Sequence, residues 1–351
     1  MKKKKLPSDF DLLVASHDMN SFAEFFSKYE ITATNVGKST SNAFSYKDLS
    51  VEQARFLMDN GLDPNIDCGF GYSAVAHQAD NKDVLDLLIK NGADVNLSVK
   101  SYNGNALARA CTTYNVQAVR NLLDAKASVD ITCGLDKKML IDGVLAGCQN
   151  IYIPSALEIC EMLLQAGAKT SEKTKGYVEE IGKRFEFFRN NISADILPRL
   201  DAALSELYVL FDVVPIEPRV MNSINEEIKV KQGNWQTQYE ELRQKLVPGR
   251  GKSETLQGEM IRIVGKITYE ILDNGGMNWD AEYKKMANAL KGYLKQNEKM
   301  DAALIDEACD IAGRINTYSG KEELYRLTEL VVKWVTSNSM PKKLGEVDYF
   351  R

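Results

Sequence analysis

The sequence has few of the residues from which metal sites and nucleophilic active sites are usually built. Only two histidines occur among 351 residues, His17 and His77, and none of the six cysteines belongs to a Cys-x-x-Cys pair. Zinc sites need clustered thiolates and imidazoles, and a serine or cysteine nucleophile needs a base beside it. We therefore expect no metal, no cofactor and no catalytic residue, and we interpret the cysteines as buried thiols in a reducing cytoplasm.

The chain also lacks long apolar runs and a strong charge of one sign. No stretch of about 18 apolar residues occurs, so no membrane span is predicted, and a formal net charge of −5 gives no basic field for nucleic acid. The basic start, residues 1–5, is followed by Leu6-Pro7-Ser8-Asp9 and not by the apolar core of a secretory signal. We expect a cytoplasmic protein in which residues 1–7 are a solvated tail.

One phrase recurs along the first half of the chain. Asn60-Gly61-Leu62-Asp63-Pro64-Asn65 is followed by Asn91-Gly92-Ala93-Asp94-Val95-Asn96, by Ala125-Lys126-Ala127-Ser128-Val129-Asp130 and by Ala166-Gly167-Ala168-Lys169-Thr170. Each phrase follows an apolar helical stripe, and the equivalent positions Gly61, Gly92, Lys126 and Gly167 are 31, 34 and 41 residues apart. A period near ~33 residues with two helices per unit predicts a solenoid of stacked repeats.

The sequence from about residue 8 to 210 resembles the ankyrin repeats. In its clearest unit, Gly71-Tyr72-Ser73-Ala74-Val75-Ala76-His77 occupies the place of the family's Gly-x-Thr-Pro-Leu-His phrase. The resemblance implies helix pairs joined by β-hairpin fingers and a concave face that binds another macromolecule. We expect an atypical cap at residues 9–29, an insertion at 149–155, and two elongated helices, 176–189 and 194–211, that close an array spanning residues 8–211.

Ankyrin proteins contact their partners through finger tips and first-helix residues on the concave face, which implies a set of contact positions here. The finger positions are Asp67, Phe70, Tyr72, Lys100, Tyr102, Asn103, Asp136 and Lys137, and the inward positions are Asp80, Arg109 and Tyr114. Exposed aromatic side chains would be good anchors, because they supply a large contact area at a small entropy cost. The alternative is that Phe70 and Tyr72 pack between neighbouring fingers.

A second domain is predicted after a proline-rich linker. Pro215 and Pro218 forbid a helix over residues 212–218. Residues 219–340 then show helical periodicity, with helices expected at 219–231, 234–246, 255–272, 279–296, 301–318 and 321–335, and residues 341–351 are expected to be a tail. The predicted fold class is all-α: an ankyrin-repeat solenoid followed by a helical bundle.

The loop at residues 247–254 ends like a phosphate-binding loop, with Gly251-Lys252-Ser253. Leu246 stands where such a loop has its first glycine, and a helix precedes it where a strand should, so nucleotide hydrolysis is not expected. A weaker anion site stays open, because Arg250 and Lys252 bring charge and the helix starting near Thr255 offers unpaired N–H groups. The alternative is a plain solvent-facing turn.

The stretch from about residue 246 to 294 resembles a family of short, uncharacterised bacterial helical proteins. The resemblance rests on its Pro-x-x-Gly, Thr-x-Gln-Gly-Glu and Asn-Trp patterns and implies no activity. Gln257, Glu259, Arg262 and Asn278 are its candidates for a polar cleft, or alternatively for an internal polar network. Gly258 and Gly265 share one helix face, which indicates the close approach of another backbone.

These features predict a monomeric scaffold or inhibitor that is not an enzyme and that binds another protein through the ankyrin fingers and concave face. The alternative is an effector or ligand-sensing protein. In that case the C-terminal domain binds a small anionic ligand or carries an unrecognised activity, and the ankyrin array selects the target.

Overall fold

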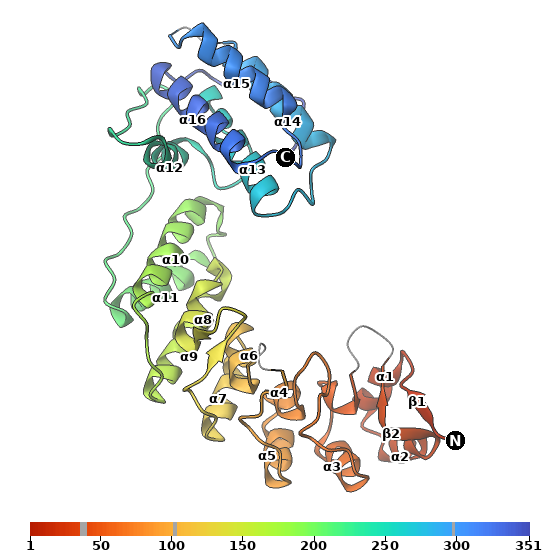
Figure 1. Ribbon diagram of the computed structural model, residues 1–351. Helices are drawn as coiled ribbons and strands as arrows, with labels where there is room; N and C mark the ends of the chain where they lie inside the picture. The colour runs from red at the N-terminus through yellow and green to blue at the C-terminus, as the bar shows by residue number, and fades with distance from the viewer. Residues whose placement is uncertain (36–40, 101–103, 297–298) are drawn as a thin grey trace. The chain divides into compact units, whose positions relative to one another are not determined.

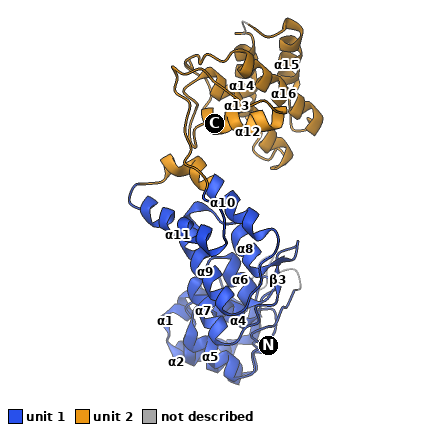
Figure 2. Ribbon diagram, turned by 90° about the vertical axis from the view of Figure 1, so that its left-hand side faces the viewer, with its two compact units in different colours: residues 1–183, 194–215 blue, residues 184–193, 216–351 orange. Residues whose placement is uncertain are grey.

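The computed structural model describes residues 1–35, 41–100, 104–296 and 299–351, which form two compact units (Figure 2). Unit 1 comprises residues 1–183 and 194–215, and unit 2 comprises residues 184–193 and 216–351. The boundary after Pro215 falls within the predicted linker, whereas residues 184–193 belong to unit 2 although the repeat pattern assigned them to the array.

Unit 1 is built mainly from short helices that follow one another in pairs (Figure 1). Its elements are β1 (Lys3–Lys5), α1 (Phe10–Ser16), α2 (Met19–Lys28), β2 (Tyr29–Thr34), η1 (Ala43–Ser45), α3 (Val51–Asp59), α4 (Ala74–Gln78), α5 (Lys82–Lys90), α6 (Ala106–Thr112), α7 (Val116–Asp124), β3 (Thr132–Cys133), β4 (Lys138–Met139), α8 (Leu140–Ala146), η2 (Asn150–Tyr152), α9 (Ile153–Gln165), the first part of α10 (Thr174–Phe188) and α11 (Leu197–Leu210).

The pairs stack in two layers. In the first layer η1, α4, α6 and α8 contact one another in succession, and in the second α3 contacts α5, α7 contacts α9, and α9 contacts α11. Helices α4, α6 and α8 also pack against the second helices of their own pairs, α5, α7 and α9. The all-α solenoid class predicted from the repeats is therefore confirmed, with the first helix of the earliest repeat reduced to the single 3₁₀ turn η1.

The recurring phrase ties each turn to the next one. Asn65 donates from Nδ2 to the main-chain oxygen of Gly92 at 2.9 Å and accepts from the N–H of Asp94 at 2.8 Å. One repeat later, Asn96 accepts from the N–H of Ser128 at 2.7 Å. In the first two copies of the phrase, the asparagine at its end thus joins neighbouring repeats.

Buried amides join the repeats from inside. The side chains of Gln53, Gln78 and Asn121 donate to main-chain oxygens of the preceding repeat or of the cap, at 3.1, 2.7 and 2.9 Å respectively. A buried donor left without its acceptor costs about 1–3 kcal/mol, so these amides favour one stacking register over others.

The expectation of a solvated tail at residues 1–7 was wrong, because β1 pairs in parallel with β2 and Leu6 is buried. Pro154, within the predicted insertion, lies in the first turn of α9, where the missing N–H of proline has no helical partner to lose.

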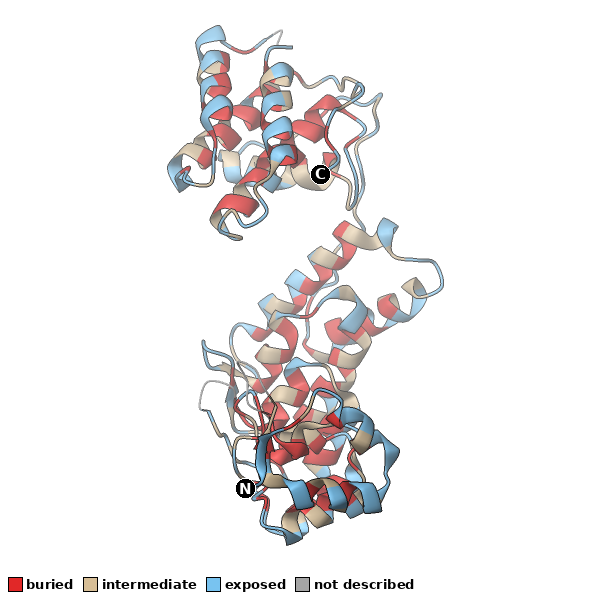
Figure 3. Ribbon diagram, turned by 90° about the vertical axis from the view of Figure 1, so that its right-hand side faces the viewer, coloured by how far each residue is buried: buried red, intermediate tan, exposed pale blue. Residues whose placement is uncertain are grey.

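Unit 2 is a bundle around one central helix. Its helices are α12 (Trp235–Leu246), α13 (Leu256–Leu272), α14 (Ala281–Leu294), α15 (Ala302–Arg314) and α16 (Lys321–Ser337), together with the end of α10 and the 3₁₀ turn η3 (Arg189–Asn191). Helix α13 contacts α12, α14 and α16. Buried residues line the facing sides of the helices (Figure 3). Within the described ranges, no helix is long and apolar enough to cross a membrane.

The helix predicted at residues 219–231 does not form. Asn222 donates from its side chain to the main-chain oxygens of Ser223 and Glu226, at 3.0 and 2.8 Å, and such local bonds compete with a helical ladder. The N–H of Ile228 donates to the main-chain oxygen of Ser339 at 2.8 Å, so the segment is held in an irregular path by a distant part of the chain.

The predicted tail at residues 341–351 is packed against unit 2. The N–H of Leu256 donates to the main-chain oxygen of Lys342 at 2.7 Å, and Lys343 forms a β-bridge with Thr255. Tyr349 is buried. This segment, called the C-terminal strap below, covers the start of α13.

Candidate functional site

The finger between α3 and α4 has a tip that holds Phe70 outward. Asp67 accepts at Oδ1 from the N–H groups of Gly69 and Gly71, at 2.9 and 3.0 Å. Gly69, Phe70 and Gly71 all have positive φ, of 131°, 57° and 78°. Positive φ is unfavourable for a residue with a Cβ, so the carboxylate of Asp67 and the flanking glycines stabilise a conformation in which the Phe70 side chain is 63% exposed.

The finger between α7 and α8 also exposes an apolar side chain at its tip, but its backbone forms a β-hairpin. Strands β3 and β4 pair in antiparallel fashion, and the turn between them contains Leu135, Asp136 and Lys137. Leu135 is 86% exposed, and the carboxylate of Asp136 pairs with Lys138. The predicted positions Asp136 and Lys137 are thus at a finger tip. Leu135, which precedes them, is an additional apolar residue there that the resemblance did not indicate.

A polar cluster fixes the base of the fingers. The guanidinium of Arg109 lies 4.7 Å from the ring centroid of Tyr72, and its Nη1 donates to the main-chain oxygen of Ala76 at 3.1 Å. The same Nη1 is 3.2 Å from Nδ1 of His77, whose Nε2 is 3.1 Å from the main-chain oxygen of Gly69. Nε2 must therefore carry the hydrogen and Nδ1 must accept.

This cluster keeps the imidazole neutral. Burial and the neighbouring charge of Arg109 lower the pKa of His77 to about 4. The sequence predicted Tyr72 and Arg109 as two separate positions of the binding surface. In the structure they contact each other. Tyr72 is half-buried, so its main contact is internal.

Tyr114 and Asp80 lie apart from these tips. Tyr114 donates from its hydroxyl to the main-chain oxygen of Val144 at 3.0 Å, and its ring stacks on Tyr152 with centroids 4.6 Å apart. Asp80 is exposed beyond the end of α4, and Lys100 pairs with Asp67 at 3.6 Å. Tyr102 and Asn103 lie outside the described residues.

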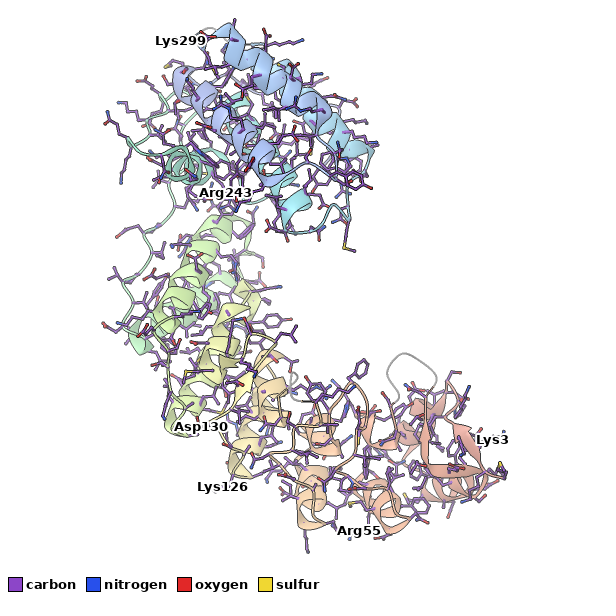
Figure 4. The ribbon with its side chains drawn as sticks, viewed as in Figure 1. Lys3, Arg55, Lys126, Asp130, Arg243 and Lys299 are labelled. Carbon is purple, nitrogen blue, oxygen red and sulfur yellow. The ribbon has the colours of Figure 1, made fainter. Side chains whose placement is uncertain are left out.

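Unit 2 contains a cavity of about 1020 Å³ lined by α12, the loop at 247–252, α13, α14 and the end of the C-terminal strap. Its lining includes six cationic side chains and one carboxylate: Arg243, Arg250, Lys252, Arg262, Lys266 and Arg351, with Glu240. Arg243 projects from α12 (Figure 4). Five aromatic side chains complete the lining: Phe187, Tyr239, Tyr269, Tyr283 and Phe350. The sequence predicted Arg250, Lys252 and Arg262 near an anion or cleft, and the structure brings these three together.

A buried ion pair supports one wall of the cavity. Arg262 donates to both carboxylate oxygens of Glu259, at 2.8 and 2.6 Å, and both side chains are buried. The hydroxyl of Tyr349 and the N–H of Ser253 also donate to this carboxylate, at 2.7 and 2.9 Å. Burial alone would raise the pKa of Glu259, but the hydrogen bonds and charge of Arg262 outweigh it and leave the pKa below its ordinary value. Glu259 is thus a fixed anion that anchors the C-terminal strap.

Three of the N–H groups near the start of α13, where an anion was expected, already have acceptors. Ser253 donates to Glu259, Leu256 to the strap, and Gly258 to the hydroxyl of Thr255 at 3.1 Å. These three N–H groups are therefore not available to an anion.

Two of the predicted cleft residues have structural partners instead. Gln257 donates to the main-chain oxygens of Asn338 and Met340, at 2.8 and 2.7 Å, and accepts from the N–H of Lys342. Asn278 donates to the carboxylate of Glu270. Neither lines the cavity.

The two glycines of α13 accommodate close neighbours. A Cβ on Gly258 would lie 2.6 Å from the main-chain oxygen of Leu246, so here the approaching group is backbone, as expected. A Cβ on Gly265 would lie 2.2 Å from the hydroxyl of Tyr239, so there it is a side chain. Gly265 therefore lets the Tyr239 ring reach the cavity wall, where burial raises the pKa of Tyr239 to about 12.

Comparisons with known proteins find similarity among solved structures. No protein-family model matches the sequence, and no curated protein does. Among solved structures, the chain is similar to an ankyrin repeat domain from Acinetobacter baumannii AYE, with 18% sequence identity and a TM-score of 0.38; the match covers 56% of this chain and 96% of that one. The solenoid architecture of unit 1 rests on its own recurring phrase, stacked helix pairs and fingers.

Proposed function

We propose that this chain is a scaffold or inhibitor that binds another protein through the fingers of unit 1. The observation that carries the proposal is the exposure of two large apolar side chains, Phe70 and Leu135, at the tips of two fingers of the same array. Exposed apolar and aromatic side chains lose unfavourable hydration when a partner covers them, which is why such residues dominate binding energy at interfaces.

The surroundings of these tips support the same function. Charged residues lie near both apolar side chains in the sequence: Asp67, which pairs with Lys100 of the segment between α5 and α6, precedes Phe70, and Asp136 and Lys137 follow Leu135. An apolar centre with a polar rim is the usual anatomy of a protein interface. The contact between Arg109 and Tyr72 restrains the finger base, so less conformational entropy is lost on binding.

The test begins by identifying the partner through affinity purification with the full chain from its native host. Affinity is then measured by calorimetry with the purified partner. The double variant Phe70→Ala with Leu135→Ala should weaken binding by more than about 2 kcal/mol, roughly 30-fold, while the melting temperature hardly changes.

A matched control removes equally exposed apolar side chains from unit 2. Val220→Ala with Met277→Ala, at positions 81% and 85% exposed, should bind like the unmodified chain. The proposal fails if the finger-tip variant keeps full affinity. If that variant melts early and still binds, Phe70 and Leu135 stabilise the fingers and the partner binds elsewhere.

A further inference from the structure

The cationic side chains that line the cavity of unit 2 outnumber the carboxylates that pair with them. Glu259 pairs with Arg262, Asp280 with Arg351, and Glu240 with Arg243. In the part of the chain that the structure describes, no carboxylate lies within ion-pair distance of the other three cations, Arg250, Lys252 and Lys266.

The pKa of Lys266 is affected by this excess of positive charge. Burial lowers the pKa of its ammonium group, and the charges of Arg262 and Arg351 lower it further, whereas the only acidic neighbour that opposes the effect is Glu259. Cations that stand close together around a cavity without counter-charges bind anions, because each added negative charge relieves their mutual repulsion.

Aromatic side chains line the cavity together with these cations. Arg262, Lys266 and Tyr269 are four and three residues apart on α13, so they lie along one face of the helix. Tyr269 and Phe350 are exposed, and both line the cavity. Exposed rings give a planar ligand group a surface to stack on, as bases do on aromatic side chains.

From this combination we propose that the cavity binds a small phosphorylated molecule with an aromatic ring, the chemical class of a nucleotide. Arg250, Lys252 and Lys266 bind the phosphate groups, and Tyr269 and Phe350 contact the ring. The volume of about 1020 Å³ lies at the upper end of small-molecule sites. The six cations line one cavity, which favours a small ligand over a nucleic-acid strand. The site is independent of partner binding by unit 1.

The test is calorimetric titration of the full-length chain with the four ribonucleoside monophosphates and their diphosphates. Inorganic phosphate, adenosine and a single-stranded RNA 12-mer are titrated in parallel. At least one nucleotide should bind with one site per chain, more tightly than both phosphate and adenosine. Raising the salt concentration should weaken this binding.

Variants assign the site to its residues. Arg250→Ala with Lys266→Ala should weaken nucleotide binding by at least tenfold, since it removes two of the three unpaired charges. Tyr269→Ala should weaken nucleotide binding several-fold and leave phosphate binding unchanged. Lys284→Ala with Lys333→Ala removes two exposed lysines of unit 2 outside the cavity and should leave binding unchanged. Each variant is first checked for an unchanged circular dichroism spectrum and melting temperature.

Four outcomes would overturn the proposal: no nucleotide binds, phosphate binds as tightly as any nucleotide, the Arg250/Lys266 variant binds normally, or the RNA binds more tightly than every nucleotide. The second outcome would leave a simple anion site, and the last would indicate a nucleic-acid surface.

Discussion

At the scale of single residues, one turn position shows how the repeats constrain the sequence. Gly61, Gly92 and Gly167 have φ of 90°, 92° and 89°, and Lys126 occupies the equivalent place with φ of 63°. Lys126 lies in the turn that follows α7 (Figure 4). A Cβ built on any of these three glycines would meet nothing within 4 Å. The preference for glycine there comes from backbone conformation alone.

Two substitutions at this turn position should change the free energy of unfolding in opposite directions. Gly92→Ala should lower the free energy of unfolding by roughly 1 kcal/mol, because positive φ is unfavourable for a residue with a Cβ. Lys126→Gly should raise it by up to about 1 kcal/mol, because it removes the same penalty. Urea unfolding followed by circular dichroism would measure both. Changes of the same sign would contradict the assignment of these positions to one repeated turn.

Residue-level prediction from sequence worked where the cause is local. The turn glycines were identified because their conformation depends on a few neighbouring residues. The full cavity lining was not, because it is assembled from distant segments: Tyr349 reaches Glu259 across 90 positions, and Arg351 reaches Arg262 across 89. No spacing rule connects residues so far apart, so Arg351 was not predicted as a site residue. Lys266 was also missed, although it lies one helical turn from Arg262 on α13.

At the scale of elements, helices with a clear apolar stripe formed where predicted, and polar or terminal segments did not. The stripe of α13 packs against three other helices, so propensity and tertiary packing favour the same structure. Segments 1–7 and 341–351 have no such stripe, and the short stripe of Val220, Ile224 and Ile228 in segment 219–231 does not produce a helix. Distant backbone groups decide the conformation of segments 1–7, 219–231 and 341–351, through pairing with β2, with residue 339 and with the start of α13 respectively.

The cap helix α2 offers a test at this scale. Phe22 is fully buried, and its ring centroid lies 5.1 to 6.2 Å from those of Phe10, Phe26 and Phe56, so it joins the cap to α3. Phe22→Ala should lower the free energy of unfolding of unit 1 by about 3–5 kcal/mol.

Phe25 on the same helix is the matched control for Phe22. It is only partly buried, so Phe25→Ala should cost no more than about half as much. Thermal or urea unfolding would compare the two variants. An equal loss would mean that the cap is not attached through the Phe22 contacts.

At the scale of the whole molecule, the two units can be observed separately. All three tryptophans, Trp235, Trp279 and Trp334, belong to unit 2, so tryptophan fluorescence reports that unit, whereas circular dichroism reports the helices of both. Residue Phe187 makes the division testable. It lies on α10, which the repeats assigned to the array, yet it packs in the core of unit 2.

The contacts of Phe187 predict which signal its loss will change. The guanidinium groups of Arg219 and Arg243 each lie 4.3 Å from the centroid of its ring. Phe187→Ala removes a buried ring and two cation–π contacts, so it should lower the stability of unit 2 by roughly 3 kcal/mol or more. The fluorescence transition in urea should therefore shift to lower concentration.

Phe22→Ala, in unit 1, is the complementary variant. It should leave the fluorescence transition of the tryptophans in place and advance only the circular dichroism change, because its contacts all lie within unit 1. Two units with separate cores unfold in separate steps when one is destabilised alone. If both variants shift fluorescence and circular dichroism equally, the chain unfolds as one cooperative body, and Phe187 stabilises the array as much as the bundle.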